Sequence, residues 1–169
     1  MRQTRITDRT PPPRLWPRLH SNAHLGFPAT GVGVRRALEK LHRILDGFHL
    51  RSCNVEIAEL VLAEVLNNIA KHAFAGGPSG IVRLTLCLQG RWLIFTVIDH
   101  GRPLPGQKLP RGAEPRIGPE REQLPEGGFG WFLIRHLSDN LCYRRQGNMN
   151  LLELRIPLVS QGDCLTGEP

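Results

Sequence analysis

The hydrophobic period of this chain changes once, from about 3.6 residues to about 2, and that change limits the folds the chain can adopt. Residues 30–46 and 59–74 carry apolar side chains at helical spacing. Residues 82–88 then alternate apolar and polar side chains, the pattern of a strand with one covered face. Residues 92–98 are apolar on both faces, so we expect this strand to be central in its sheet.

Shorter segments complete the expected sheet. Residues 24–27 predict an edge strand, and residues 131–137 predict an apolar helix. Residues 141–145 and 151–156 predict a hairpin that turns at residues 146–148. The fold class expected from these elements is a two-layer α/β sandwich, with a mixed, largely antiparallel sheet and its helices on one face.

The helix ends carry their own signals. Thr30 is expected to cap the first helix and Gly47 to end it. Either Ser52 or Asn54 is expected to cap the second helix, which we expect to stop at residues 76–78, where two glycines precede a proline.

The expected domain boundaries follow changes in composition. Residues 1–20 are rich in Arg and Pro and predict a flexible arm, residues 21–158 predict a single folded domain, and residues 159–169 predict a loose tail. Within the domain, residues 103–126 hold six prolines and show no regular period. A segment of that length inside a compact domain is typical of a lid.

The net charge of +7 invites a nucleic-acid interpretation, but much of it lies in the arm. Five basic residues fall there: Arg2, Arg5, Arg9, Arg14 and Arg18. The remaining domain is mildly basic and has no basic face interleaved with aromatic side chains, so we do not expect nucleic acid as a partner. The four cysteines include no CxxC pair, so neither a zinc site nor a disulfide framework is expected.

The sequence predicts no association with a membrane. The longest apolar run has only the length of a strand, and the N-terminal segment has positive charge without the apolar core of a secretory signal. We therefore expect a cytoplasmic protein.

One side of the second helix carries polar groups where a core is expected. Glu64, Asn68 and His72 stand four residues apart and project from the same side, and a helical wheel places the first two beside Leu60 and Val61. A carboxylate and an amide that face a core are costly unless a ligand or partner uses them. For His72 we expect a hydrogen bond within the fold rather than a ligand.

Two further motifs follow in order along the chain. Asp99-His100-Gly101 comes directly after the predicted central strand, and Gly127-Gly128-Phe129-Gly130 opens the helix after the predicted lid. Each motif alone is typical of ordinary structure, since aspartates form turns and glycines form linkers. Their order and spacing relative to the polar helix face suggest a shared site.

Together the three motifs resemble those of the GHKL, or Bergerat-fold, ATPase family, and specifically its small serine/threonine kinase branch that acts as anti-sigma factors in bacterial partner switching. Residues 64–68 with His72 resemble the N box of that family, residues 99–101 its G1 box, and residues 127–130 its G2 box. The resemblance covers residues 25–157.

The resemblance implies ATP and Mg²⁺ as cofactors, with Glu64 as the general base and Asn68 as the magnesium ligand. It places Asp99 and Gly101 at adenine, where an ionised carboxylate accepts a hydrogen bond from the exocyclic amino group and the glycine lets the backbone approach the base. Gly128 and Gly130 would present backbone amides to phosphate at a helix N-terminus.

The chain departs from the family pattern near the implied adenine site. Pro103 stands where many members have a second glycine, and Leu104 and Pro105 stand where the small kinases often have an aromatic and an acidic residue. Asn150 stands about where many relatives have a threonine that supports the adenine contact.

The implied function is an Mg-ATP-dependent serine/threonine protein kinase. Its substrate would be a STAS-type anti-anti-sigma protein, and it would sequester a sigma factor or another regulator, with residues 30–46 as a surface for a partner or a homodimer. One alternative is a non-catalytic nucleotide-binding module that sequesters a partner. A sensor histidine kinase fragment is a third interpretation. It is disfavoured because the region that holds His20, His24, His42 and His49 is too short for a two-helix phosphoacceptor domain in addition to the first helix.

Overall fold

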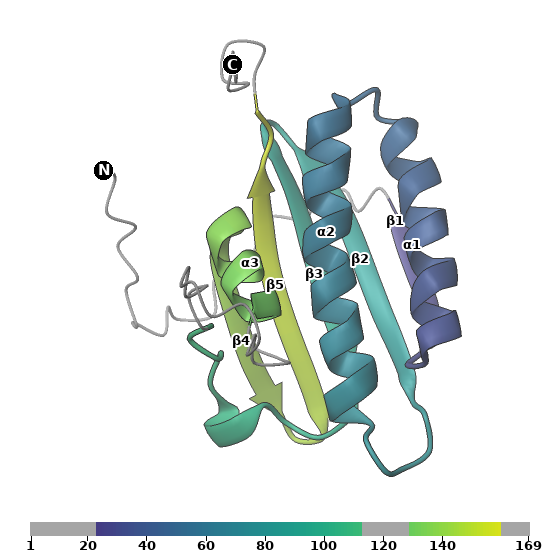
Figure 1. Ribbon diagram of the computed structural model, residues 1–169, viewed down its shortest axis with the longest axis vertical. Helices are drawn as coiled ribbons and strands as arrows, with labels where there is room; N and C mark the ends of the chain where they lie inside the picture. The colour runs from purple at the N-terminus through teal and green to yellow at the C-terminus, as the bar shows by residue number, and fades with distance from the viewer. Residues whose placement is uncertain (1–22, 113–128, 160–169) are drawn as a thin grey trace, which may run out of the picture.

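The computed structural model describes residues 23–112 and 129–159 of the 169-residue chain. Its helices pack on one face of a single sheet (Figure 1). The strands are β1 (Ala23–Pro28), β2 (Ile81–Gln89), β3 (Trp92–Asp99), β4 (Asp139–Gln146) and β5 (Met149–Pro157). The helices are α1 (Gly31–Asp46), α2 (Ser52–Asn68), which continues into a π-helical turn η1 (Ile69–Ala73), a 3-10 turn η2 (Pro105–Gln107), and α3 (Phe129–Leu137).

The sheet has the strand order β1-β2-β3-β5-β4, so β3 is central and β1 lies at an edge, as predicted. The two-layer α/β class is confirmed. The sheet was expected to be mixed but largely antiparallel. All four strand pairings among the described residues are antiparallel, so no parallel pair is found there. Strands β4 and β5 form the predicted hairpin, and β5 also runs antiparallel to β3.

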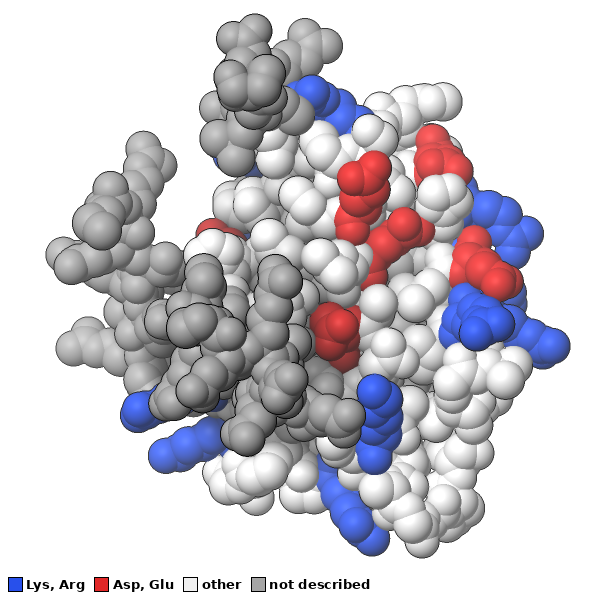
Figure 2. Space-filling view, viewed as in Figure 1, with Lys and Arg blue, Asp and Glu red and all other residues white. Residues whose placement is uncertain are grey.

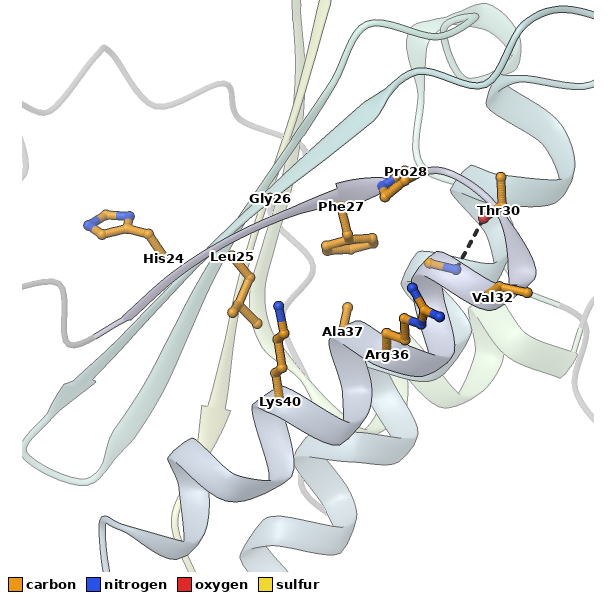
Figure 3. Close-up of a pocket in the computed structure, with 11 residues that line it drawn as sticks. His24, Leu25, Gly26, Phe27, Pro28, Thr30, Val32, Arg36, Ala37 and Lys40 are labelled. Carbon is orange, nitrogen blue, oxygen red and sulfur yellow. Dashed lines mark hydrogen bonds between the residues drawn. The ribbon is translucent and has the colours of Figure 1, made fainter.

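Helix α1 follows the sequence signals closely. The side chain of Thr30 accepts a hydrogen bond from the amide of Gly33 at 3.1 Å, the capping contact drawn in Figure 3, and Gly47 ends the helix. Its buried side chains fall on one stripe that faces the sheet: Val34, Ala37, Leu41 and Leu45.

Helix α2 departs from the sequence expectations at both ends. Neither Ser52 nor Asn54 caps it, because the N-cap residue is Arg51, which makes no side-chain capping bond. The Asn54 side chain instead accepts a hydrogen bond from the Val159 amide at 2.8 Å and donates one to the Val159 carbonyl at 3.4 Å. At its other end the α-helix stops at Asn68 and gives way to η1, well before residues 76–78.

The orientation of α2 also corrects the helical wheel. Val61, Leu62, Val65 and Leu66 are buried against the sheet, whereas Leu60, expected in the core, is 43% exposed. The apolar residues of α2 span too wide an arc for the sequence alone to choose its centre.

Several sequence expectations concern residues outside the described ranges. They include the arm at 1–20, residues 113–126 of the predicted lid, Gly127 and Gly128, and the tail after Val159. Among the described helices, none combines the length and the apolar character that a membrane span requires.

Candidate functional site

The three sequence motifs meet where the carboxyl end of β3, the end of α2 and the start of α3 come together. The Arg102 amide donates a hydrogen bond to the Ala73 carbonyl at 2.7 Å, which joins the loop after β3 to η1. A Cβ on Gly101 would lie 2.6 Å from that carbonyl oxygen, so only glycine fits this approach. Nearer the middle of α2, a Cβ on Gly130 would collide with Oε2 of Glu64. Helix α2 and its π-helical turn therefore contact both of the other motifs.

Asp99 ends β3 with its side chain on the face of the sheet that the helices cover. It is 4% exposed, and its Oδ1 accepts hydrogen bonds from the Gly101 amide at 2.7 Å and from Nδ2 of Asn150 at 2.8 Å. Two donors on one oxygen compensate for the burial of the carboxylate. Because an ionised carboxylate only accepts hydrogen bonds, this group suits a ligand that presents a donor.

The surroundings of Asp99 include residues that the sequence motifs did not single out. Oδ1 of Asn150 accepts hydrogen bonds from the Tyr143 hydroxyl and from Nη1 of Arg145, both at 2.7 Å. The Tyr143 hydroxyl in turn accepts from the Leu104 amide at 3.1 Å. Tyr143 and Arg145 stand two residues apart on β4, so their side chains lie on the same face of the sheet. Arg145 pairs with Asn150 in the register of β4 with β5, which puts all three side chains on one face.

Asn68 is the last residue of α2, immediately before the π-helical turn. Its side-chain Nδ2 is buried and has no hydrogen-bond partner among the described residues. The nitrogen and oxygen of an amide exchange places by rotation, so this side chain can turn a carbonyl oxygen toward a ligand. Asn68 therefore fits an Mg²⁺ ion held mainly by nucleotide phosphates, which needs few protein ligands. The described residues hold no cluster of three or more His, Cys, Asp or Glu side chains placed for a metal.

The π-helical turn changes the expected position of His72. Turns of this kind are frequent at functional sites, and they shift the residues that follow relative to the α-helical register. His72 is exposed and makes no hydrogen bond within the described part of the chain, so the expected internal hydrogen bond is absent there. Glu64 and Asn68, which precede the turn, remain half-buried on the same side of α2.

Glu64 lies against the first turn of α3. The contact of its Oε2 with Gly130 brings a carboxylate to the N-terminal end of a helix, where the backbone amides carry partial positive charge. The family resemblance implies phosphate-binding glycines at this same end of α3. Gly130 is thus positioned beside Glu64, whereas Gly128 lies outside the described residues.

The first part of the predicted lid is anchored. Arg135 on α3 donates from Nε to the Pro110 carbonyl at 2.6 Å and from Nη2 to the Leu109 carbonyl at 3.1 Å. Gly112 has a φ of +76°, and a Cβ there would lie 2.6 Å from the Phe132 amide nitrogen. Residues 109–112 therefore follow α3 closely.

Residues 27–156 match the family described as the histidine kinase-like ATPase domain. The chain belongs to this family. The match takes in α2, β3 and the start of α3, and it confirms the resemblance to GHKL ATPases.

Among characterised proteins, the chain is 28% identical over 102 residues to serine-protein kinase RsbW of Oceanobacillus iheyensis, a match that covers 59% of this chain and 63% of the relative. It is 23% identical over 88 residues to anti-sigma F factor of Anoxybacillus flavithermus, covering 51% and 58% respectively. It is 29% identical over 114 residues to blue-light-activated histidine kinase 2 of Erythrobacter litoralis, covering 64% and 29%. The matched segments span less than two thirds of each of these relatives.

A solved structure shares the fold. The structure of the RsbU and RsbW domains of Rv1364c from Mycobacterium tuberculosis superimposes with a TM-score of 0.54 at 16% identity, over 80% of this chain and 32% of that chain. At this identity the likeness concerns the fold, and it agrees with the two-layer architecture. The anti-sigma-factor kinase branch of the family, expected from the three motifs, is also where the first two relatives belong by name.

Proposed function

We propose that the protein is an Mg-ATP-dependent serine/threonine protein kinase that regulates a partner protein in the manner of an anti-sigma factor. The observation that carries this proposal is the meeting of the three motifs, with Glu64 against α3 and the Asp99 loop bonded to the end of α2. The family match and the names of the first two relatives support it.

In this proposal Asp99 accepts a hydrogen bond from the adenine amino group, and Gly101 leaves room for the base. Asn68 holds Mg²⁺, which would neutralise charge on the ATP phosphates. Gly130, together with Gly128, presents backbone amides to the phosphates.

Glu64 acts as the general base in the same proposal. Its carboxylate would accept the proton of the attacking Ser or Thr hydroxyl as that oxygen bonds to the γ-phosphorus and the bond to ADP breaks. Its contact with Gly130 places it beside the amides proposed to hold the phosphates. A base must lie within hydrogen-bond reach of the proton it removes, so the proposal requires the substrate hydroxyl to approach between Glu64 and the bound γ-phosphate.

We propose a STAS-type anti-anti-sigma protein as the substrate and a sigma factor or similar regulator as the sequestered partner. The surface we assign to a partner, or to a second copy of the chain, is α1 with the adjoining edge strand β1. Figure 3 shows Phe27 and Ala37 on opposite walls of the groove between them, with Arg36 and Lys40 on the helix side, and the groove has a volume of about 340 Å³. Elsewhere on the helix-bearing face acidic and basic side chains are interspersed (Figure 2), unlike the single-sign surface typical of a nucleic-acid interface.

A second candidate is a nucleotide-binding module that sequesters its partner without phosphotransfer. Pro103 and Pro105 favour it, because they alter the rim of the base site relative to the small kinases and flank Leu104, whose amide is bonded to Tyr143. The proposed kinase and this module differ in one step only, the transfer of the γ-phosphate.

The first test is calorimetric titration of the purified protein with ATP, with and without Mg²⁺, and with GTP. We expect binding that depends on Mg²⁺ and prefers ATP. Incubation with radiolabelled ATP and a STAS-type protein should then label that protein. ATP binding without label in any such protein would support the sequestering module, and absence of nucleotide binding would overturn both candidates.

A further inference from the structure

A row of polar side chains crosses three strands at the end of the sheet that holds Asp99. Asp99 on β3 pairs directly with Asn150 on β5, and Asn150 pairs directly with Arg145 on β4. Tyr143, two residues before Arg145, has its side chain on the same face. Asp99 and Asn150 are each 4% exposed, two of only three polar or charged residues among the described residues that are fully buried.

Asn150 bonds to its neighbours through both ends of its amide. Its Oδ1 accepts from Tyr143 and Arg145, whereas its Nδ2 donates to Asp99 at 2.8 Å and to the carbonyls of Gly101 and Arg102 at 3.3 and 3.2 Å. Rotation of the amide would set its NH₂ group against two donors and its oxygen against a carboxylate and two carbonyls. The partners therefore allow one orientation, with the donor facing Asp99.

Within the described part of the chain, this arrangement leaves Oδ2 of Asp99 available to a ligand. Its Oδ1 is occupied by the Gly101 amide and by Asn150. The loop that follows is held as well, since Nη1 of Arg145 donates to the Gly101 carbonyl at 2.8 Å and Tyr143 accepts from the Leu104 amide at 3.1 Å. Asp99 thus has little freedom to rotate, and its Oδ2 is presented from a fixed position.

We propose that Asn150, oriented by Tyr143 and Arg145, is the positioning residue that determines the nucleobase preference of this site. The inference rests on the proposed function, since it requires a purine nucleotide at Asp99. A fixed carboxylate oxygen accepts a hydrogen bond from a 6-amino purine and repels the oxygen of a 6-oxo purine. Without Asn150 the Asp99 carboxyl group loses one of the two hydrogen bonds to Oδ1 and gains rotational freedom, so it can turn away from a 6-oxo base, which then meets less repulsion.

The decisive measurement is the dissociation constant for inosine triphosphate divided by that for ATP. These two nucleotides differ only at position 6 and the adjacent N1, and neither carries the 2-amino group of guanine. Titrations with Mg²⁺ would compare the wild type, Asn150→Ala and Tyr143→Phe. The matched control is Asn148→Ala, the same substitution at an exposed position in the turn between β4 and β5. We expect Asn150→Ala to lower the ratio about tenfold, the effect of one hydrogen bond to a charged group. Tyr143→Phe should lower it about threefold, and the control should match the wild type.

A merely structural role for Asn150 would move other quantities. It would lower the melting temperature of the nucleotide-free protein and weaken both nucleotides by the same factor, leaving the ratio within about twofold of wild type; that outcome overturns the inference while the proposed kinase stands. If Asn150→Ala does not fold, an unchanged ratio in Tyr143→Phe overturns it equally. If the wild type binds neither nucleotide, the proposed function fails and this inference fails with it.

Discussion

Helices α1 and α2 lie side by side on the same sheet, yet they differ in their capping, in the way they end and in the groups they bury. Helix α1 has a side-chain cap at Thr30, a glycine stop and a single buried stripe. Helix α2 has no side-chain cap and ends in a π-helical turn, and the buried Nδ2 of Asn68 has no partner among the residues that the structure describes. The features that weaken α2 as a helix all lie at or beyond Asn68, except the missing cap. Helix α1 thus satisfies the ordinary requirements of a helix, whereas the end of α2, where we propose that nucleotide binds, departs from them.

The strongest way to sharpen this contrast is to remove the carboxylate of Glu64. We expect Glu64→Gln to lower the rate of phosphotransfer by about 10²–10⁴-fold, the contribution of a general base, and to leave ATP affinity nearly unchanged. The control is Glu56→Gln, an exposed position on the same helix. Single-turnover transfer of labelled phosphate measures the rate, and wild-type rates in Glu64→Gln would remove Glu64 from the proposed chemistry.

The next largest effect is expected at the contact between η1 and the loop after β3. In Gly101→Ala the added Cβ would lie 2.6 Å from the Ala73 carbonyl oxygen, so the loop and the turn must separate. We expect ATP affinity to fall about tenfold or more, because the Asp99 loop then moves. Gly31→Ala on α1 is the matched control, since nothing lies within 4 Å of its added Cβ. Equal ATP affinity in the two variants would show that the η1 contact has no part in nucleotide binding.

Asn68→Ala separates ligand binding from stability. The substitution removes a buried amide nitrogen that no described residue hydrogen-bonds, so the free energy of unfolding should stay constant or rise by about 1 kcal/mol. The increase in ATP affinity produced by Mg²⁺ should disappear. Chemical denaturation and calorimetry with and without Mg²⁺ measure the two quantities. A marked loss of stability together with unchanged magnesium dependence would contradict both parts.

The smallest effect is expected on α1. Thr30→Ala removes the capping bond to Gly33 and should lower the free energy of unfolding by about 1 kcal/mol. Thr30→Ser, which keeps the acceptor, is the control. ATP affinity should remain at the wild-type value in both variants, and a nucleotide-binding defect in Thr30→Ala would break the division of roles between the two helices.

Local patterns predicted most of the fold because the packing of this protein obeys them. Residues 24–27 were predicted to form an edge strand, and residues 92–98, which are apolar on both faces, a central strand; the strand order of the sheet confirms both predictions. Thr30 and Gly47 marked the limits of α1 through short-range hydrogen bonds. For α1, the residues that carry the signal lie within a few positions of the contacts they make.

The features that escaped prediction depend on partners far along the chain. Asn54 looks like a helix cap but bonds to the backbone of Val159. The π-helical turn has no sequence signal of its own, because residues 69–73 favour an ordinary helix. The last residue of the turn, Ala73, accepts a hydrogen bond from the Arg102 amide, which lies far along the chain. The motifs identified Glu64, Asn68 and Asp99, whose proposed roles remain predictions, but Tyr143 and Arg145 became visible only through the register of β4 with β5.

The bonds between Asn54 and Val159 have a practical consequence for probes of this protein. They fasten the residues after β5 to the first turn of α2, whereas the nucleotide site is proposed at the last turn of the same helix (Figure 1). Fourteen residues of helix separate Asn54 from Asn68, a distance of about 20 Å. A fluorophore coupled near residue 159 is therefore held at a known separation from the site, so energy transfer to a labelled nucleotide would measure occupancy without touching the pocket.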